Sequence, residues 1–420
     1  MKSEMNGHLE NVATLSSGGA AAIAAFAGEL SPRRKTKVLL LADWIYVAEG
    51  GTEQHLLFLQ RELPRELLDL HLGVLGTLDR ILAEDCPMRP IKFNGFPSSL
   101  WGKLARLRGL ATFIETNKID VVHTFGPTSE IYACLAVKLA GRGKVLGVRR
   151  NIGYRHTWRS RWLARFVGLL GARYAANCEA AREFAAKVEW IGRRRVTVIP
   201  NPAPTERLKE GLANVPPRAS LGIADDERVV GIVATVRPVK DYATFLRAAR
   251  LVLDEHPRTR FLVIGGGVPD YKVQMVHLAH ELGIERQVTW LGPQPNPLCV
   301  VPLFDVAVLS SYSEAMSNAV IEYAAAGVAT VATDVGGTRE VVEDGQTGFL
   351  VRSRDPQAMA RRIAQLLADE DLRRTMGERA RLRIKGPFSQ SIILAKYAAL
   401  YGQLVGHAPD VHPSHDRLDA

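Results

Sequence analysis

Short runs of aliphatic and β-branched residues alternate with helical patterns along most of the chain, and this rhythm restricts the possible folds more than any other feature. The first run is KVLLLAD at residues 37–43, and the helical stretch EQHLLFLQRELP at 53–64 follows it. Strands that alternate with helices pair in parallel and are covered by helices. We therefore expect an α/β fold. In the first half, the expected strands are Lys37–Ala42, Leu70–Val74, Val121–His123, Val145–Val148 and Val196–Ile199.

A Pro-rich, aperiodic stretch at residues 198–218 divides this pattern into two halves, and RVVGIVAT at 228–235 restarts it. A chain of 420 residues is long for one hydrophobic core. We expect an N-terminal domain at 36–205, a linker at 206–225 and a C-terminal domain at 226–387. Both domains should be doubly wound, with a ligand where the carboxyl ends of their strands face a cleft.

The two ends of the chain lack the alternating pattern. Residues 1–35 are dominated by Ala, Gly and Ser and are expected to be a disordered extension, and 407–420 a disordered tail. Between them, FSQSIILAKYAALYGQLVG at 388–406 predicts an amphipathic helix that packs back across the domain boundary. No run of eighteen apolar residues predicts a membrane span.

The net charge restricts the possible binding partners of the protein, and the cysteine content indicates its redox environment. The formal net charge of +10 indicates an anionic partner: nucleic acid, a phosphorylated metabolite or an acidic membrane surface. The cysteines form no CxxC pair that would suggest zinc, and reduced core cysteines of a cytoplasmic protein are expected. They are Cys86, Cys134, Cys178 and Cys299.

Two loops that follow strands carry features suited to phosphate. Gly50 and Gly51 precede a helix, and such glycines let a phosphate approach backbone N–H groups at its positive end. A tight turn that needs glycine for conformation alone is an equal alternative, since neither GK[ST] nor GxGxxG is present. In the second half, Arg237 and Lys240 stand between the first strand and its helix. They would neutralise a diphosphate, or else lie on a solvated loop.

The segment SYSEAMSNAVIE at residues 311–322 places two carboxylates, Glu314 and Glu322, at a fixed spacing. A helix is expected to begin near Ser317, with Glu314 in the preceding loop. On one helix the pair would be about 12 Å apart along the axis and roughly 80° around it. This separation is too large for acid-base work on one bond. It suits contacts at the two ends of an elongated ligand, with phosphates over the helix N-terminus.

In their order, these motifs resemble those of glycosyltransferase family 4, a large group of retaining GT-B enzymes. The resemblance extends from about Lys37 to Gly406. It implies the GT-B fold: two Rossmann-like domains that face a central cleft, with a C-terminal helix that crosses back to the N-terminal domain. Glu314 and Glu322 match the E-x7-E motif of the family. By analogy, Glu314 contacts donor-sugar hydroxyls and Glu322 contacts the ribose.

The same resemblance assigns the other donor contacts and a catalytic group. Gly50 and Gly51 match the glycine loop that meets the donor diphosphate, and Arg237 and Lys240 resemble a basic clamp on it. His123 is similar to an N-domain histidine near the sugar, with a capped strand-end histidine as the alternative. The implied catalytic residues are Lys240, Arg237, Glu314 and His123. The implied donor-binding residues are Gly50, Gly51, Arg237, Lys240, Glu314, Ala315, Met316, Ser317, Asn318 and Glu322.

Several positions depart from the family pattern. Ala315 replaces the usual glycine after the first glutamate, and Ala329 replaces a common proline. Thr235 stands where an arginine is frequent, so Arg237 would take its place, and Phe125 stands where many members carry a second histidine. Only the change at Thr235 removes a charged group from the inferred diphosphate site.

The resemblance implies transfer of a sugar from a UDP or GDP sugar with retention, by substitution on the same face. No cofactor or metal is expected, because Arg237, Lys240 and the helix N-termini would carry the diphosphate charge and no Asp-x-Asp motif accompanies a strand. The expected acceptor is a glycan or a lipid-linked glycan of cell-surface polysaccharide biosynthesis.

An aromatic and basic stretch within residues 155–173 is the expected acceptor or membrane contact. Trp158, Trp162, Phe166 and Leu170 recur every four residues among arginines. Such a helix binds an anionic bilayer or a lipid pyrophosphate, or else packs its apolar stripe into the domain. Peripheral attachment to the inner face of the plasma membrane is the preferred interpretation.

Three other functions use parts of the same pattern. A GT-B-like sugar-nucleotide epimerase would share the fold and differ in its product. Nucleic-acid binding would use the basic stretch, but no helix-turn-helix, zinc-finger or RRM pattern accompanies it, and we expect no nucleic-acid partner. A Rossmann oxidoreductase is disfavoured, because neither half opens with GxGxxG.

Overall fold

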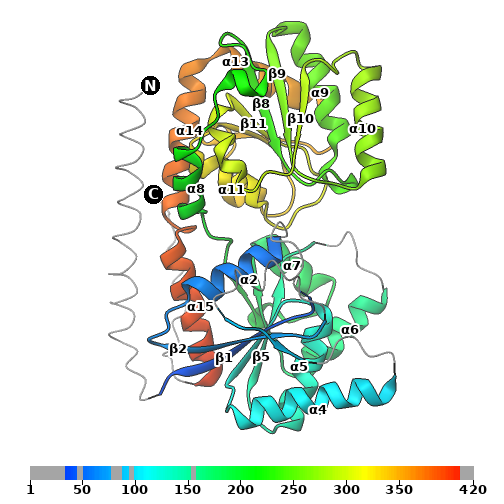
Figure 1. Ribbon diagram of the computed structural model, residues 1–420, viewed down its shortest axis with the longest axis vertical. Helices are drawn as coiled ribbons and strands as arrows, with labels where there is room; N and C mark the ends of the chain where they lie inside the picture. The colour runs from blue at the N-terminus through cyan, green and yellow to red at the C-terminus, as the bar shows by residue number, and fades with distance from the viewer. Residues whose placement is uncertain (1–33, 45–50, 77–87, 94–98, 153–157, 407–420) are drawn as a thin grey trace.

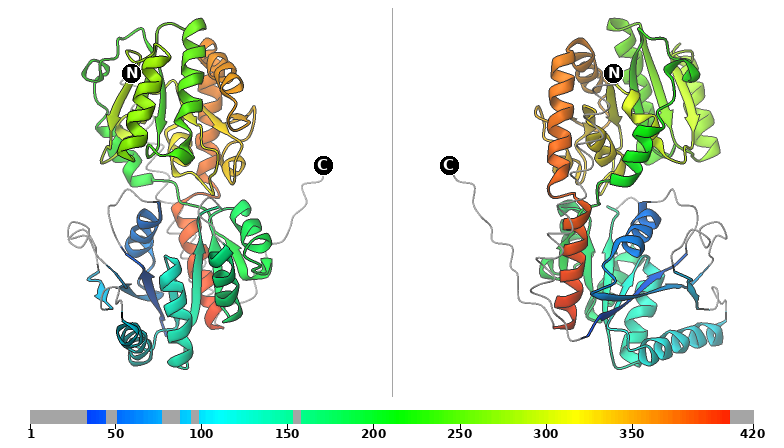
Figure 2. Two further views of the ribbon diagram at one scale, coloured as in Figure 1. Left: turned by 90° about the vertical axis from the view of Figure 1, so that its right-hand side faces the viewer. Right: turned by 60° about the vertical axis from the view of Figure 1, so that its left-hand side comes forward.

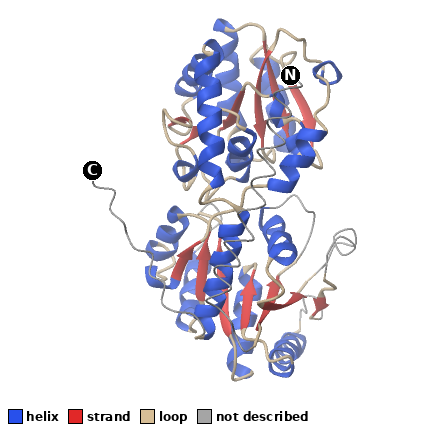
Figure 3. Ribbon diagram, turned by 90° about the vertical axis from the view of Figure 1, so that its left-hand side faces the viewer, coloured by secondary structure: helices blue, strands red, loops and turns tan. Residues whose placement is uncertain are grey.

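The computed structural model describes residues 34–44, 51–76, 88–93, 99–152 and 158–406, which form two α/β domains stacked end to end (Figure 1). The N-terminal domain is coloured blue to teal and lies below, and the C-terminal domain is coloured green to orange and lies above. Helices cover both sides of each sheet (Figure 3). The predicted two-domain α/β class is confirmed.

The N-terminal sheet is parallel, and its described strands follow the order β3-β2-β1-β4-β5-β6-β7. These strands are β1 (Thr36–Ala42), β2 (Leu68–Val74), β3 (Ile91–Lys92), β4 (Val121–Thr124), β5 (Lys144–Arg149), β6 (Arg173–Ala176) and β7 (Val196–Val198). The helices of this domain are α2 (Gly51–Glu62), α4 (Leu100–Thr116), α5 (Pro127–Leu139), α6 (Trp158–Leu169) and α7 (Glu179–Lys187), with a 3₁₀ turn η1 (Arg193–Arg195).

The C-terminal sheet is also parallel and follows the order β10-β9-β8-β11-β12-β13 within the described chain. Its strands are β8 (Arg228–Val233), β9 (Thr259–Ile264), β10 (Val288–Gly292), β11 (Val306–Leu309), β12 (Thr330–Thr333) and β13 (Gly348–Val351). The remaining helices are α8 (Thr205–Ala213), α9 (Tyr242–Glu255), α10 (Pro269–Glu281), α11 (Asn318–Ala326), α12 (Thr338–Val341), α13 (Pro356–Ala368), α14 (Glu370–Lys385) and α15 (Gln390–Val405). Short 3₁₀ turns are η2 (Arg218–Leu221), η3 (Pro238–Lys240), η4 (Pro297–Cys299) and η5 (Val301–Leu303).

Strand β1 shows why a continuous apolar run becomes a central parallel strand. Successive side chains of a strand point to opposite faces. Leu39 and Leu41 pack in the cluster formed with α4, α5 and α7, whereas Val38 and Leu40 pack in the cluster under α2 and α15. Both faces are buried, so both sets of positions must be apolar.

The C-terminal helix α15 leaves the C-terminal domain and packs on the N-terminal one, as Figure 2 shows for the red helix. Ile393, Tyr397 and Tyr401 are buried in the same cluster as β1 and α2. The chain passes between the domains twice, once near Ala203 and once near Phe388. A hydrogen bond joins these two segments, in which the amide of Ala203 donates to the carbonyl of Phe388 over 2.8 Å. The predicted crossing helix is confirmed.

The predicted linker at 206–225 is wrong, because this segment is folded onto the C-terminal domain. It contains most of α8 and all of η2. Leu208 is buried, and a Cβ at Gly211 would lie 2.6 Å from the carbonyl of Leu298, so α8 lies directly on η4. Proline-rich flanks obscured a helix only nine residues long.

The sequence pattern also failed to separate α6 from β6. The four-residue aromatic repeat suggested one helix through Arg173, but α6 ends at Leu169 and Arg173 opens β6. Gly171 adopts a positive φ of 96°, a conformation that glycine adopts without strain, and turns the chain into the strand. Strand β3, with two residues, was too short to predict.

Several expectations concern segments outside the described residues, namely the extension up to residue 33, the tail from 407, Gly50, Cys86 and Arg155. Among the described cysteines, Cys134 and Cys178 are buried, as predicted, whereas Cys299 is half-buried, and all three have free thiols. None of the described helices combines the length and the apolar character needed to cross a bilayer.

Candidate functional site

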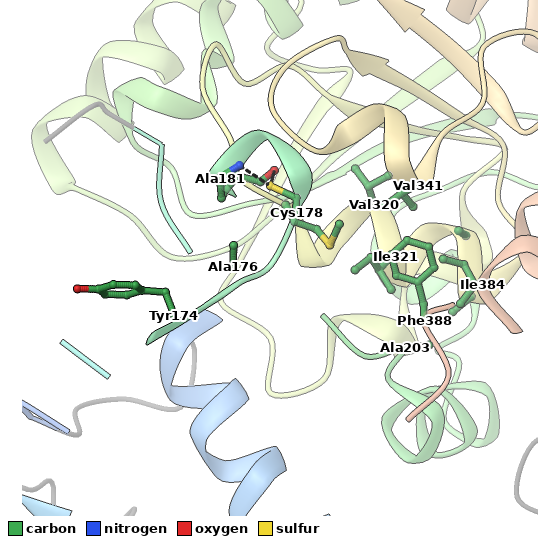
Figure 4. Close-up of a cluster of buried hydrophobic side chains, with 14 of the residues drawn as sticks. Tyr174, Ala176, Cys178, Ala181, Ala203, Val320, Ile321, Val341, Ile384 and Phe388 are labelled. Carbon is green, nitrogen blue, oxygen red and sulfur yellow. Dashed lines mark hydrogen bonds between the residues drawn. The ribbon is translucent and has the colours of Figure 1, made fainter. Parts of the chain in front are cut away.

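The loops at the carboxyl ends of the two sheets meet in direct contacts. The hydroxyl of Ser313 donates to the carbonyl of Ile152 over 3.1 Å, and the thiol of Cys178 donates to the carbonyl of Ala315 over 3.1 Å. The apolar cluster is continuous across this seam, and Figure 4 shows Cys178 of the N-terminal domain near Val320 and Ile321 of α11. The segment with the two glutamates therefore faces the N-terminal domain, as expected for a cleft ligand.

Lys240 and Glu314 form an ion pair, although 74 residues separate them in the chain. Lys240 ends η3 after β8, and Glu314 lies in the loop between β11 and α11. Both side chains are largely buried, with 13% and 12% exposed. The Ser311 hydroxyl donates to Glu314 Oε1 over 2.7 Å, and the Ser310 hydroxyl donates to the Lys240 carbonyl over 2.7 Å. The structure thus brings together two of the predicted site residues and fixes them with hydroxyl groups.

Arg237 directly precedes η3 and is half-buried, three positions ahead of Lys240. Thr235, at the position where the family pattern has a basic residue, is exposed. The short turn therefore keeps two cations on one loop, with Lys240 oriented by its carboxylate partner.

The N-terminus of α11 meets the N-terminus of α2 from the opposite domain. Asn318, the first residue of α11, accepts at Oδ1 from Nδ2 of Asn201 over 2.6 Å and donates toward Gln54 of α2 over 3.4 Å. A Cβ at Gly51 would lie 3.5 Å from Nδ2 of Asn318. Ser317 takes the N-cap position without a side-chain capping bond, which leaves first-turn N–H groups for a ligand.

Ala315 and Met316 are buried, and they connect the site to the domain seam. The carbonyl of Ala315 accepts both from the Cys178 thiol and, over 2.6 Å, from the amide of Gly337. Gly337 itself is restricted, because a Cβ there would lie 2.6 Å from Cβ of Cys178. The structure thus accommodates Ala315 in place of the usual glycine, and its carbonyl accepts a hydrogen bond from the opposite domain.

Glu322 lies more than one turn inside α11, as predicted, and forms an ion pair that the sequence did not reveal. Nη1 of Arg207 on α8 lies 3.1 Å from Glu322 Oε1. Burial raises the pKa of the Glu322 carboxyl, and the Arg207 charge opposes this shift. Arg207 was missed because it falls in the segment assigned to a linker. The only signal was the helical pattern TERLKEGL around it.

The side chain of His123 on β4 is buried beneath α15. Its side chain has 0% exposure, its Nδ1 lies 2.8 Å from the hydroxyl of Tyr401 on α15, and its ring lies 4.4 Å from that of Phe125. Burial and the nearby Arg150 lower the pKa of His123 to about 3. In this structure His123 is a buried residue whose side chain binds α15, and a contact of its ring or backbone with the sugar stays a prediction. The alternative of a strand histidine with a structural role agrees with the geometry.

Two arginines at the end of β5 have different surroundings. Arg149 binds Glu130 over 2.8 Å and Glu189 over 2.5 Å, and it stacks 4.3 Å from the ring centre of Tyr174. Arg150 instead donates to the carbonyl of Gly51 over 3.1 Å. Both were unassigned from the sequence, and the second one fastens β5 to the start of α2 at the cleft.

Helix α6 exposes its aromatic residues rather than burying them. Trp158, Trp162 and Phe166 are 67%, 57% and 49% exposed. Trp162 makes an edge-to-face contact with Trp190, whose ring also lies 5.3 Å from the guanidinium carbon of Arg165. The alternative of a packed apolar stripe is therefore wrong for Trp158, Trp162 and Phe166, whereas Leu170, the fourth residue of the repeat, packs against the core.

Comparisons with known sequences support the same division of the chain. The profile described as Glycosyltransferase Family 4 matches residues 49–207, and the profile described as Glycosyl transferases group 1 matches residues 217–383. D-inositol 3-phosphate glycosyltransferase of Nocardia farcinica is 38% identical over 221 residues, which cover 50% of this chain and 48% of the relative. The chain thus spans about half the length of this curated relative. The putative glycosyltransferase EpsD of Bacillus subtilis is 27% identical over 79% of this chain and 88% of its own length.

Solved structures show the same fold at low sequence identity. HepE of Anabaena, crystallised with UDP, has a TM-score of 0.75 at 21% identity and covers 88% of this chain and 100% of its own. Sucrose-phosphate synthase of Thermosynechococcus elongatus has a TM-score of 0.73 at 20% identity, over 89% of this chain and 100% of its own. Together with the two matching profiles and the paired sheets, these similarities show that the chain belongs to glycosyltransferase family 4 and has the GT-B fold.

Proposed function

We propose that this chain transfers a sugar from a UDP or GDP sugar to a glycan or lipid-linked acceptor of cell-surface polysaccharide biosynthesis, with retention at the anomeric carbon. The observation that carries the proposal is the Lys240–Glu314 pair beside the uncapped start of α11, opposite the start of α2. This arrangement offers a cation and two helix N-termini to one diphosphate. HepE, with the same fold, was crystallised with UDP and with UDP-glucose.

The charge that develops on the leaving diphosphate explains the role of the basic loop. In the proposed reaction the bond from the anomeric carbon to the diphosphate oxygen breaks, and its electron pair leaves with the diphosphate. The acceptor oxygen bonds to that carbon on the same face, and its proton passes to a phosphate oxygen. Lys240, and Arg237 beside it, stabilise the diphosphate as its charge grows. In this proposal no metal is required for that step.

The two glutamates divide the donor between them in this proposal. Glu314, oriented by Lys240 and Ser311, accepts hydrogen bonds from the sugar hydroxyls. Glu322, more than one helical turn further along, accepts from the ribose. The backbone from Ala315 to Asn318 lies between them, where the phosphates are expected.

The exposed face of α6 is the proposed membrane contact, and the protein would work in the cytoplasm at the inner face of the plasma membrane. Exposed aromatic rings insert at the headgroup boundary, and arginines attract anionic lipid. Arg161 and Arg165 are exposed on the same helix as Trp158, Trp162 and Phe166. A lipid-linked acceptor would then reach the N-terminal domain from the bilayer.

Thermal unfolding with UDP, GDP and ADP sugars tests the donor site directly. A ligand that binds only the folded protein raises its melting temperature. We expect a rise with a UDP or GDP sugar, and a smaller rise for Lys240→Ala. Absence of a rise with every nucleotide sugar would refute the donor site. Product analysis then separates a glycosyltransferase, which forms a glycoside, from an epimerase, which returns an isomerised nucleotide sugar.

A further inference from the structure

Glu322 is held by a residue from a distant part of the chain. Its side chain is only 8% exposed, and Nη1 of Arg207 lies 3.1 Å from Oε1. Arg207 precedes Glu322 by 115 positions and lies outside the E-x7-E motif. A buried carboxylate needs a partner that compensates for lost hydration. Arg207 is therefore part of the environment that decides how Glu322 meets a ligand.

The backbone that carries Arg207 is fixed to the C-terminal domain. Nδ2 of Asn296 donates to the carbonyl of Arg207 over 2.7 Å. Leu208 is buried, and Gly211 allows α8 to approach Leu298 so closely that a Cβ would lie 2.6 Å from its carbonyl. Since α8 cannot shift without losing these contacts, the guanidinium is presented to α11 from a fixed position.

The charge of Arg207 opposes the effect of burial on Glu322. Burial raises the pKa of the Glu322 carboxyl, and the Arg207 guanidinium lowers it. Tyr323 is the adjacent titratable group on α11, and burial raises the pKa of its phenol, so it stays neutral. From α14, the side chain of Arg381 lies near Gly327 at the end of α11. Other charged groups on α8 and α12 are bound elsewhere: Glu206 to Lys209, Arg339 to Asp334, and Glu340 to the amide of Glu179.

We infer that Arg207 is a positioning residue, which keeps the Glu322 carboxylate ionised and oriented to accept hydrogen bonds from the ribose of the donor nucleotide. The inference rests on the proposed donor site. The bond from Arg207 goes to Oε1, so Oε2 is left for the ribose hydroxyls. An ionised carboxylate accepts on both oxygens, whereas a protonated one loses part of that capacity. Loss of Arg207 should therefore weaken nucleotide binding most at low pH.

Calorimetric titration with UDP and GDP from pH 5 to pH 8 tests this role. For the nucleotide that wild type binds, Arg207→Gln should raise Kd about tenfold, the scale of one lost charged hydrogen bond. The loss should grow as pH falls, because without the Arg207 charge the Glu322 carboxyl takes up a proton at a higher pH than in wild type. Arg207→Lys should recover most of the affinity, since one donor to one oxygen is needed. Lys209→Gln, on the same helix, is the matched control.

A double-mutant cycle separates positioning from a general effect on the fold. In Glu322→Gln, a further Arg207→Gln change should leave Kd within about twofold, because the carboxylate that Arg207 orients is gone. A purely structural Arg207 would lower the melting temperature and leave Kd and its pH dependence unchanged, which would overturn the inference. If Arg207→Gln does not fold, Arg207→Lys takes its place in the cycle, and an equal rise in Kd in the wild-type and the Glu322→Gln backgrounds would overturn the inference. Failure of wild type to bind either nucleotide would instead refute the donor site.

Discussion

Two kinds of buried polar pair differ in charge: the pairs around the two glutamates of the C-terminal domain and the histidine pairs beneath α15 in the N-terminal domain. In the C-terminal domain, Lys240 pairs with Glu314 and Arg207 pairs with Glu322, so each carboxylate has a cation. In the N-terminal domain, two buried histidines bind tyrosine hydroxyls of α15, His55 to Tyr397 and His123 to Tyr401, each over 2.8 Å. The first pairs are ionic and partly open to solvent, whereas the second pairs are neutral and enclosed.

This difference indicates separate tasks. Ion pairs at the edge of a cleft can exchange partners with an incoming diphosphate at little desolvation cost, because the charges are already in place. Neutral histidine-tyrosine pairs offer no charge to a diphosphate. Their hydrogen bonds attach the crossing helix α15 to the N-terminal domain. In the proposed function the donor charge is therefore stabilised from the C-terminal domain.

Loss of Lys240 should have the largest effect on activity, and it tests whether the ion pairs, unlike the histidine pairs, act on the donor. Lys240→Ala should lower turnover about a hundredfold, because it removes a cation that stabilises the leaving diphosphate. Steady-state kinetics with the identified donor measure this effect, with Lys187→Ala, a side chain 77% exposed on α7, as the control. Equal turnover in Lys240→Ala and wild type would contradict the assignment of charge to the C-terminal domain.

Acid should break the neutral pairs of the N-terminal domain. Burial lowers the pKa of His55 well below its ordinary value of 6.5 and that of His123 to about 3. Below pH 6.5 the unfolded chain therefore binds protons that the folded protein excludes, so stability is complete above pH 6.5 and falls as pH decreases toward 3. His123 should cost about 2 kcal/mol between pH 7 and pH 5, roughly a 25-fold change in the folding equilibrium, and His55 should add to this loss in the same direction.

Urea unfolding at both pH values measures this loss. Replacing His123 with Leu together with Tyr401→Phe removes both polar groups and should remove the share of the pH dependence that His123 contributes, while the share of His55 remains. His277→Gln changes an exposed histidine and should leave it as in wild type. A free energy of unfolding that stays constant from pH 7 to pH 5 would show that the buried histidines are not neutral.

Glu322 gives the next largest effect and separates binding from chemistry. Glu322→Ala should raise Kd for UDP or GDP about tenfold, because the ribose loses its acceptor and Arg207 loses its partner. Turnover at saturating donor should fall less, since the contact is present before and during the reaction. Calorimetry and kinetics on the same variant distinguish the two. A drop in turnover with unchanged affinity would mean that Glu322 acts at the reacting atoms.

The local patterns explain how much of this could be predicted. The alternation of apolar runs with helices gave both domains, because each strand buries both faces and must be apolar throughout. Ser317 as the expected N-cap correctly located the start of α11 at Asn318, since capping is a local signal. The rule that the loops after parallel strands gather at one edge of a sheet predicted that the loops of Lys240 and Glu314 lie near each other, but the ion pair between the two side chains was not predicted.

The remaining features depend on partners far away in the chain. Arg207 is brought to Glu322 by the packing of Gly211 on Leu298, and no local pattern records that contact. His123 sits on a strand whose faces are both buried, so only the position of α15 shows that Tyr401 covers it. The end of α6 depended on one glycine, Gly171, inside a repeat that continued past it.

Substitutions on the exposed face of α6 are expected to have the smallest effect. They test whether the outer surface of the N-terminal domain binds membranes and that of the C-terminal domain does not. Substituting Trp158, Trp162 and Phe166 with Ser should lower sedimentation with vesicles that contain phosphatidylglycerol by several-fold, roughly the loss of three partly inserted rings. The melting temperature should hardly change, because these side chains are already exposed. Leu382→Ser on α14, 62% exposed in the C-terminal domain, is the control. If α6 is the membrane contact, wild type must bind anionic vesicles more strongly than neutral ones, and the triple substitution must weaken the binding. If either condition fails, α6 is not a membrane contact, and its aromatic face is left for a protein or glycan partner.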